Sequence, residues 1–125
     1  MTNYLLWNKR VFDTLFDIAQ QVAPVRSARI AAAVVCRNQI MSIGTNKYKT
    51  DPLQARYSRK GQIYVHAEVD AIKNVRYRID LSKCDLYVAR AKLTECGQWA
   101  VGNCRPCPGC QKIIEMYGIQ NVYHT

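Results

Sequence analysis

The sequence lacks long hydrophobic runs and low-complexity segments. None of its apolar stretches is long enough to span a bilayer, and the start of the chain lacks the layout of a signal peptide. We therefore expect a cytoplasmic protein that does not enter a membrane. Apolar residues make up 49% of the 125 positions. A chain of this length and composition can bury a hydrophobic core without disulfide bonds or a structural metal, and we expect residues 1–125 to form a single domain.

Acidic residues are scarce. The chain has 9 of them against 18 lysines and arginines, which gives a formal net charge of +9. Such an excess favours phosphorylated or polyanionic partners, nucleic acid included. Charge speaks to association rather than to fold, and a basic surface that binds no such partner is the alternative.

Histidine is scarcer still. The chain has only His66 and His124, against six cysteines, three of which fall within residues 104–110. In a chain without a secretion signal, clustered cysteines indicate metal binding or catalysis rather than a disulfide scaffold. The sequence assigns no role to Cys36, Cys84, Cys96 or Cys104.

The spacing of apolar residues predicts three helices and four strands, joined by polar loops. The helices cover residues 2–22, 66–75 and 107–118, and the strands cover residues 30–36, 39–43, 85–91 and 121–124. Strands that alternate with helices favour a mainly parallel sheet with helices on both faces. The first two strands are close enough in sequence to form an antiparallel edge hairpin. We therefore expect a three-layer α/β fold around a mixed sheet of about four strands.

The stretch PCPGC places Cys107 and Cys110 three apart at the start of a predicted helix. At this spacing both sulfurs turn toward one point, and the free amides and dipole of a helix start favour the thiolates that bind metal. A redox pair or two buried thiols is the alternative for an isolated CxxC. Cys104 and Cys107 form a second CxxC, but Pro106 suits a helix start and favours the later pair.

A catalytic zinc site needs a third protein ligand and an open position. His66 opens another predicted helix, whereas His124 lies near the end of the last strand, so His66 is the better ligand. Helix starts that follow adjacent parallel strands meet at one edge of the sheet. Glu68 would then reach the open position and move protons between a bound water and a leaving group. Alone, a His-x-Glu triplet is more often an ordinary solvent-facing helix start.

Together, HAE at residues 66–68 and PCPGC at residues 106–110 resemble the signature of the zinc-dependent cytidine and deoxycytidylate deaminase superfamily. The order of elements resembles the deaminase core over nearly the whole chain, which implies a cytidine deaminase-like fold. The resemblance also implies a hydrolytic deaminase in which one histidine and two cysteines hold zinc and a glutamate shuttles protons. These residues are His66, Cys107, Cys110 and Glu68. HAEVDAI and KTDPLQA look most like small phage-encoded deaminases, which would place the protein in a host cytoplasm.

The resemblance nominates three residues that would bind the substrate. In GTN, residues 44–46, Asn46 matches an asparagine that holds the sugar in many family members, although an ordinary turn after a strand is the alternative. The backbone amide of Ala67 and the backbone carbonyl of Arg105 would hold the base. Related enzymes are commonly oligomers and the last strand would be an exposed edge, so we also expect a homo-oligomer.

A free cytosine nucleoside or nucleotide, most of all dCMP, is the expected substrate. Arginine suits phosphate, and Arg56 and Arg59 in the polar loop 47–62 are the candidates for binding it. A deaminase of single-stranded DNA or RNA, acting on cytosine or on tRNA adenosine, is the second hypothesis, because this loop combines basic residues with tyrosines. A noncatalytic, zinc-stabilised binding module is the third. Glu68 argues against it, because a structural site needs no such carboxylate.

Overall fold

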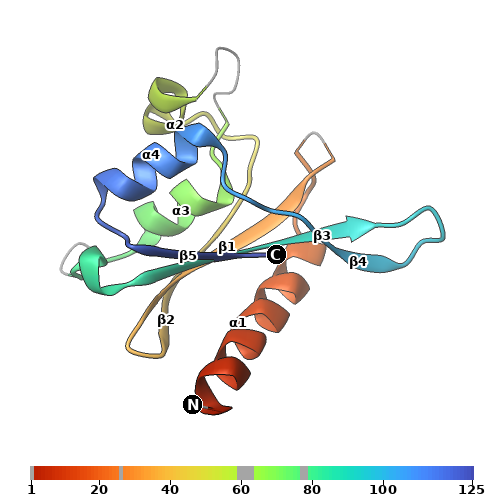
Figure 1. Ribbon diagram of the computed structural model, residues 1–125. Coiled ribbons are helices and arrows are strands. Elements are labelled where there is room, and N and C mark those ends of the chain that lie inside the picture. The colour runs from red at the N-terminus through yellow and green to blue at the C-terminus, as the bar shows by residue number, and fades with distance from the viewer. Residues whose placement is uncertain (1, 26, 59–63, 77–78) are drawn as a thin grey trace.

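A computed structural model shows a five-stranded sheet with helices on both faces (Figure 1). The structure describes residues 2–25, 27–58, 64–76 and 79–125. The elements are α1 (Thr2–Gln20), β1 (Arg29–Cys36), β2 (Gln39–Thr45), α2 (Pro52–Tyr57), α3 (Ala67–Asn74), the 3-10 turn η1 (Leu81–Lys83), β3 (Asp85–Leu93), β4 (Trp99–Gly102), α4 (Pro108–Met116) and β5 (Asn121–His124). In this part of the chain no helix combines the length and the apolar character needed to cross a membrane.

The strands are ordered β2-β1-β3-β4, and β5 also pairs with β3. The predicted mixed sheet between helices is confirmed, but the expectation that it is mainly parallel is wrong. Only β3 and β5 pair in parallel, whereas the other three pairs are antiparallel. β2 and β3 do run in the same direction, as a helical connection favours, but β1 lies between them. The strands that run in parallel are therefore mostly not neighbours.

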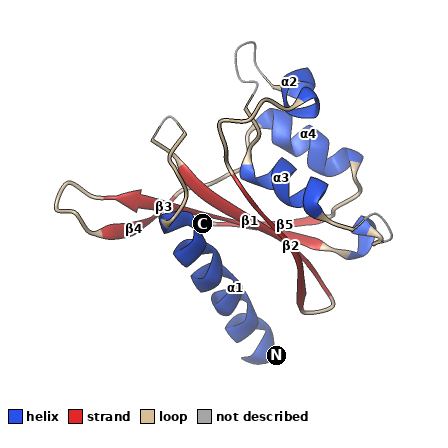
Figure 2. Ribbon diagram, turned by 180° about the vertical axis from the view of Figure 1, so that it is seen from behind, coloured by secondary structure: helices blue, strands red, loops and turns tan. Residues whose placement is uncertain are grey.

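The helices form two layers, with α1 alone on one face of the sheet and α2, α3 and α4 on the other (Figures 1 and 2). Alternate residues of β3 face opposite sides, as the pleat of a strand requires. Leu86 and Val88 join the core with α3 and α4, whereas Tyr87, Ala89 and Ala91 pack with α1. The central part of the sheet is thus buried on both faces.

All the predicted helices and strands are present, with ends shifted by a few residues. His66 and Cys107 do not open α3 and α4 but precede them as N-cap residues. Two elements, α2 and β4, lie in segments expected to be loops. A local signal for α2 exists, because the Asp51 side chain caps it and Pro52 occupies its first turn.

α3 and α4 begin at the same level of the sheet, although the strands before them run in opposite directions. Thr45, the last residue of β2, pairs with Ala31, which pairs with Ala89 on β3. The next residue of β3, Arg90, pairs with Gly102, the last residue of β4. Because β4 has only four residues, it ends level with β2 instead of crossing the sheet. The two helix starts therefore meet as predicted, but not because they follow parallel strands.

β4 and β5 lie end to end along the same edge of β3, and Thr125 joins them. Its amide donates to the Val88 carbonyl (3.1 Å), and its carbonyl accepts from the Cys104 amide (3.0 Å). Its hydroxyl donates to the Gly102 carbonyl (2.6 Å) and accepts from the Arg90 amide (3.2 Å). Thr125 thus completes the pairing of β3 where neither edge strand reaches.

Candidate active site

Gly44 lets α3 approach β2 at backbone contact. A Cβ atom at residue 44 would lie 2.1 Å from the Ala71 amide nitrogen and 2.5 Å from the Ala67 carbonyl oxygen. No side chain fits in such a space, so the glycine sets how close the helix lies to the sheet. This approach fixes the position of Ala67 and the residues beside it.

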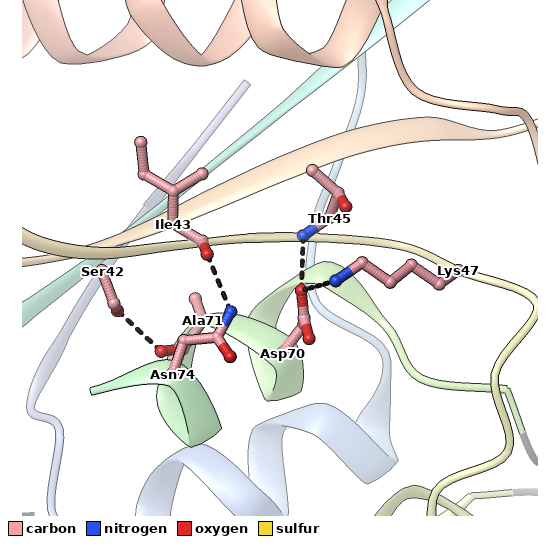
Figure 3. A network of polar contacts seen from close by, with 7 residues as sticks. All are labelled: Ser42, Ile43, Thr45, Lys47, Asp70, Ala71 and Asn74. Atoms are coloured by element: carbon pink, nitrogen blue, oxygen red, sulfur yellow. Dashed lines mark hydrogen bonds and ion pairs between the residues drawn. The ribbon is translucent and has the colours of Figure 1, made fainter. Parts of the chain in front are cut away.

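Four hydrogen bonds then hold α3 against β2 and the residues after it (Figure 3). They run from Ser42 Oγ to the Ala71 carbonyl (2.7 Å), from Asn74 Nδ2 to the Ile43 carbonyl (3.0 Å), and from the Thr45 amide and Lys47 Nζ to Asp70 Oδ2 (3.0 Å each). The Ser42–Ala71 bond is buried, and together the four bonds hold three residues of α3, so they resist rotation as well as separation. The start of α3 is thereby held in place before any ligand binds.

The three predicted metal ligands lie together at the starts of α3 and α4. His66 Nδ1 is 3.1 Å from Cys110 Sγ and 3.7 Å from Cys107 Sγ, and all three ligand atoms lie within 4.8 Å of one another. Tetrahedral zinc with ordinary Zn–N and Zn–S bonds separates a nitrogen from a sulfur by about 3.6 Å. The observed distances bracket that value, so these residues fit a zinc ion. His124 is exposed and is not part of the group.

The two cysteines share negative charge. A hydrogen bond from Cys110 lowers the pKa of the Cys107 thiol to about 4, with His66 and the Cys110 backbone amide contributing. The same hydrogen bond, together with burial, raises the pKa of Cys110. The hydrogen bond with Cys107 raises the pKa of His66. The group therefore favours a thiolate at Cys107, and a bound zinc would hold both cysteines as thiolates and His66 as a neutral imidazole.

Gln54 on α2 is a site residue that the sequence analysis missed. Its side chain is fully buried, and its Oε1 accepts from the His66 amide (3.1 Å). Its Nε2 donates to Cys110 Sγ (3.6 Å) and to Ser58 Oγ (2.8 Å). One amide therefore orients two of the three ligands, which is the role of a hydrogen-bonding partner behind a metal site.

α2 itself is tied to α3 and α4. The Asp51 carboxylate accepts a hydrogen bond from the backbone amide of Gln54 (2.9 Å) and forms an ion pair with Lys73 of α3. At the other end of α2, the Tyr57 carbonyl lies against the start of α4, where a Cβ at Gly109 would be 2.6 Å from its oxygen. The helix that carries Gln54 is thus linked both to α3 and to the start of α4.

Glu68 lies in the first turn of α3, with 4% of its surface exposed. Burial raises the pKa of its carboxyl, because the charged form loses water contact. The carboxyl lines the same cavity as His66 and Cys107. A carboxyl with a raised pKa beside the metal ligands is suited both to accept and to donate protons.

The cavity has a volume of about 300 Å³. Among the predicted residues, Asn46 and Arg105 line it, and Ala67 lies fully buried next to Glu68. Asn46 already accepts from the Ile30 amide and donates to the Ala28 carbonyl, both at 2.9 Å. The asparagine therefore also fixes the start of β1, in addition to any contact with a ligand.

The two arginines predicted to bind phosphate are placed differently. Arg56 is exposed on α2, its guanidinium 5.7 Å from the Tyr57 ring, and does not line the cavity. Arg59 lies outside the described residues. Arg90 of β3 does line the cavity. The alternation of β3 was the signal that could have found it, because Arg90 falls on the same face as Val88.

A histidine and two cysteines beside a buried glutamate, at two helix starts over a mixed sheet, define a zinc-binding deaminase domain. Residues 5–125 match the family described as the cytidine and deoxycytidylate deaminase zinc-binding region, and the chain belongs to that family. The match confirms the predicted resemblance and the predicted zinc cofactor.

Solved structures share the fold. The dCMP deaminase of cyanophage S-TIM5 in apo form has a TM-score of 0.62 at 21% identity over 94% of this chain and 80% of that chain. The same enzyme in complex with dCMP and dUMP has a TM-score of 0.60 at 20% identity over 93% and 78%. Guanine deaminase from Bacillus subtilis has a TM-score of 0.63 at 22% identity over 94% and 62%. At these identities the likeness establishes the cytidine deaminase-like fold. Among curated protein sequences, none matches the chain.

Proposed function

We propose that the protein hydrolytically deaminates a free cytosine nucleoside or nucleotide, dCMP above all. The observation that carries this proposal is the buried carboxyl of Glu68 in one cavity with His66 and Cys107. A purely structural zinc site needs no such carboxyl, which argues against a noncatalytic binding module. The likeness to a phage dCMP deaminase that binds dCMP and dUMP supports a nucleotide substrate.

In the proposed reaction, water adds to the amine-bearing ring carbon and the C–N bond breaks, which releases ammonia. His66, Cys107 and Cys110 would hold a zinc ion, which would supply Lewis acidity to activate the water. Glu68 takes a proton from the attacking water and delivers protons to the ring nitrogen and the departing amine. The raised pKa of Glu68 suits it to hold a proton between these transfers.

The remaining predicted residues orient the base and the sugar. In α3, Ala67 is the first residue, and its amide is one of those that a helix leaves without an intrahelical acceptor. The Ala67 amide would donate a hydrogen bond to the base, and the Arg105 backbone carbonyl would accept one from the base. Beyond its two bonds to β1 and the residues before it, the Asn46 amide keeps one hydrogen and one lone pair for the sugar.

Deamination of single-stranded DNA or RNA is the second candidate. The net charge of +9 and the exposed Lys47, Lys49 and Arg56 favour it, because a nucleic acid needs a basic track. A panel of deoxycytidine, cytidine, dCMP, CMP, a single-stranded DNA and a tRNA, assayed for ammonia release at one salt concentration, separates the two. We expect turnover of a free nucleotide. Conversion of the nucleic acids alone would overturn the preferred substrate.

Glu68→Gln tests the catalytic role. The variant keeps the shape of the side chain but cannot carry protons, so turnover should fall by at least about 100-fold. Zinc content, measured by plasma mass spectrometry, should stay at about one ion per chain. Glu95→Gln, on the exposed β3–β4 turn, is the matched control. Retained turnover in Glu68→Gln would remove the assigned role, and a folded, zinc-free wild type would remove the metal.

We also propose that the chain acts as a homo-oligomer in the cytoplasm, the host's if it is phage-encoded. All six cysteines are free, which suits a reducing compartment. Leu93, Trp99 and Val101 on the β3–β4 hairpin are 51%, 38% and 60% exposed, and a second copy would cover such apolar side chains. Light scattering of the purified protein tests the oligomer, and a monomeric mass would contradict it.

A further inference from the structure

Arg90 stands where the pattern of β3 calls for a core residue. Leu86 and Val88 are fully buried on the face that packs with α3 and α4. Alternation places Arg90 on that same face, one step further along the strand. Its side chain lines the cavity that Glu68 and His66 also line. A cation therefore extends the apolar core into the wall of the active site.

The local structure makes room for this side chain. Gly102 is the β4 partner of Arg90, and a Cβ there would lie 3.0 Å from Arg90 Cδ and 2.7 Å from the Lys92 side chain. The missing side chain leaves space for the stem of Arg90. The Thr125 hydroxyl, which accepts from the Arg90 amide, fixes the backbone at the same point.

One nitrogen of the Arg90 guanidinium is not satisfied by the protein. Its Nε is buried and has no hydrogen-bond partner among the described residues. The two ion pairs in that part of the chain, Lys47–Asp70 and Lys73–Asp51, do not involve it. Arg90 is half-buried as a residue, but an unpaired buried donor such as its Nε is destabilising. The group is therefore suited to an anion that comes from outside the chain.

The charges around the cavity favour such an anion. Arg90 and Arg105 both line it, and among its described lining residues Glu68 is the one carboxylic acid, while the Cys107 thiolate belongs to the metal group. Glu68 forms no ion pair with Arg90 among the described contacts, so its carboxyl does not neutralise the arginine. Guanidinium groups bind phosphate oxygens in pairs, with two parallel hydrogen bonds.

We propose that Arg90, assisted by Arg105, binds a phosphate group of the substrate. This inference rests on the proposed function, because it names the charged part of the same substrate. The phosphate is either the 5′ monoester of a free nucleotide or a diester of a single-stranded nucleic acid. Either source presents the oxygens that the guanidinium lacks. Arg90 is thus proposed in place of Arg56, one of the two arginines predicted from the sequence to bind phosphate.

Steady-state kinetics with dCMP and deoxycytidine test the inference. We expect the wild type to prefer dCMP, and Arg90→Gln to lower the ratio of the two kcat/KM values by roughly 10- to 100-fold, mainly through KM for dCMP. Arg90→Lys keeps the positive charge but loses the paired donors of the guanidinium, so its ratio should lie between those of the wild type and Arg90→Gln. Calorimetric Kd values for dUMP and deoxyuridine should show the same loss of preference without turnover.

Three further variants make the test specific. Arg10→Gln, on the exposed side of α1, controls for loss of one positive charge and should leave the ratio unchanged. Gly102→Ala crowds the stem of Arg90 and should lower the ratio with the arginine still present. Arg56→Gln tests whether Arg56 binds the phosphate instead of Arg90. If Arg56→Gln lowers the ratio and Arg90→Gln does not, the inference is overturned. Zinc content and thermal unfolding show whether each variant is folded. If Arg90→Gln is not folded, the ratios measured for Arg90→Lys and Gly102→Ala decide whether the inference holds.

The outcomes also separate this inference from the proposed function. A wild type that deaminates deoxycytidine as well as dCMP, together with unchanged oligonucleotide affinity in Arg90→Gln, overturns the phosphate role and leaves the deaminase intact. A wild type that turns over no cytosine substrate overturns the proposed function, and the dUMP and deoxyuridine affinities then judge Arg90 alone. If Arg90→Gln weakens only a single-stranded oligonucleotide, the phosphate role holds and its source is the diester backbone.

Discussion

The two sides of the cavity differ in how their polar groups are satisfied. On the metal side, the side-chain amide of Gln54 is hydrogen-bonded to the His66 backbone and to Cys110 Sγ. On the same side, hydrogen bonds hold α3 against β2. On the β3 side, Arg90 Nε has no partner in the described part of the chain. The first side is preorganised, because its groups are fixed before a ligand arrives. The second leaves a charge for the ligand to complete.

The largest effect should come from removing a ligand on the preorganised side. Cys107→Ser replaces a thiolate whose pKa is about 4 with a hydroxyl that stays protonated, so zinc and deamination should both be lost. Metal analysis and ammonia release measure the two losses. Cys96→Ser, exposed on the hairpin, should change neither. Full zinc content in Cys107→Ser would mean that the metal has other ligands.

The next effect tests how rigidly α3 is held. Gly44→Ala forces a methyl to within 2.1 Å of the Ala71 amide nitrogen, and we expect a loss of about 3 kcal/mol in the free energy of unfolding. Gly97→Ala is the control, because nothing lies within 4 Å there and only its φ of +77° is unfavourable. That control should lose about 1 kcal/mol. Equal losses in urea unfolding would show that the close approach is not what positions the helix.

Gln54→Leu removes the support behind the metal while keeping the ligands. Zinc affinity, measured by competition with a chelator, should fall by roughly 10- to 100-fold. The Co²⁺-loaded protein should show an altered ligand-field spectrum, which a change in stability alone would not produce. Ser58→Ala removes only the bond on the far side of Gln54 and should have little effect. Unchanged affinity and spectrum in Gln54→Leu would contradict its positioning role.

The smallest effect concerns the anchoring of α2. Burial raises the pKa of Asp51, but its bonds to Lys73 and the Gln54 amide outweigh burial, and the net pKa is lowered. The carboxylate therefore stabilises the fold above its unfolded pKa near 3.8, and this contribution is lost as pH falls through the lower folded value. Asp51→Ala should lose about 1 kcal/mol at pH 7, and Asp51→Asn less, because asparagine still caps. A difference that does not shrink as pH falls below 3.8 would contradict this account.

The sequence predicted the parts of the molecule that depend on local pattern. His66, Cys107, Cys110 and Glu68 belong to two short motifs whose chemistry is readable without the fold, and the structure brings them together. Gln54 was missed because its role comes from contacts with Cys110, which is 56 positions away. The direction of the strands was misjudged because helical connections fix which strands are parallel but not which are neighbours.

The hydrogen bonds of Thr125 connect the edge of the sheet with the wall of the cavity. Its amide, carbonyl and hydroxyl all serve the strand edge beside Arg90 and Cys104, next to the cavity. A Thr125→Val substitution, which removes only the hydroxyl, is therefore expected to loosen the backbone at Arg90 and with it the wall of the cavity.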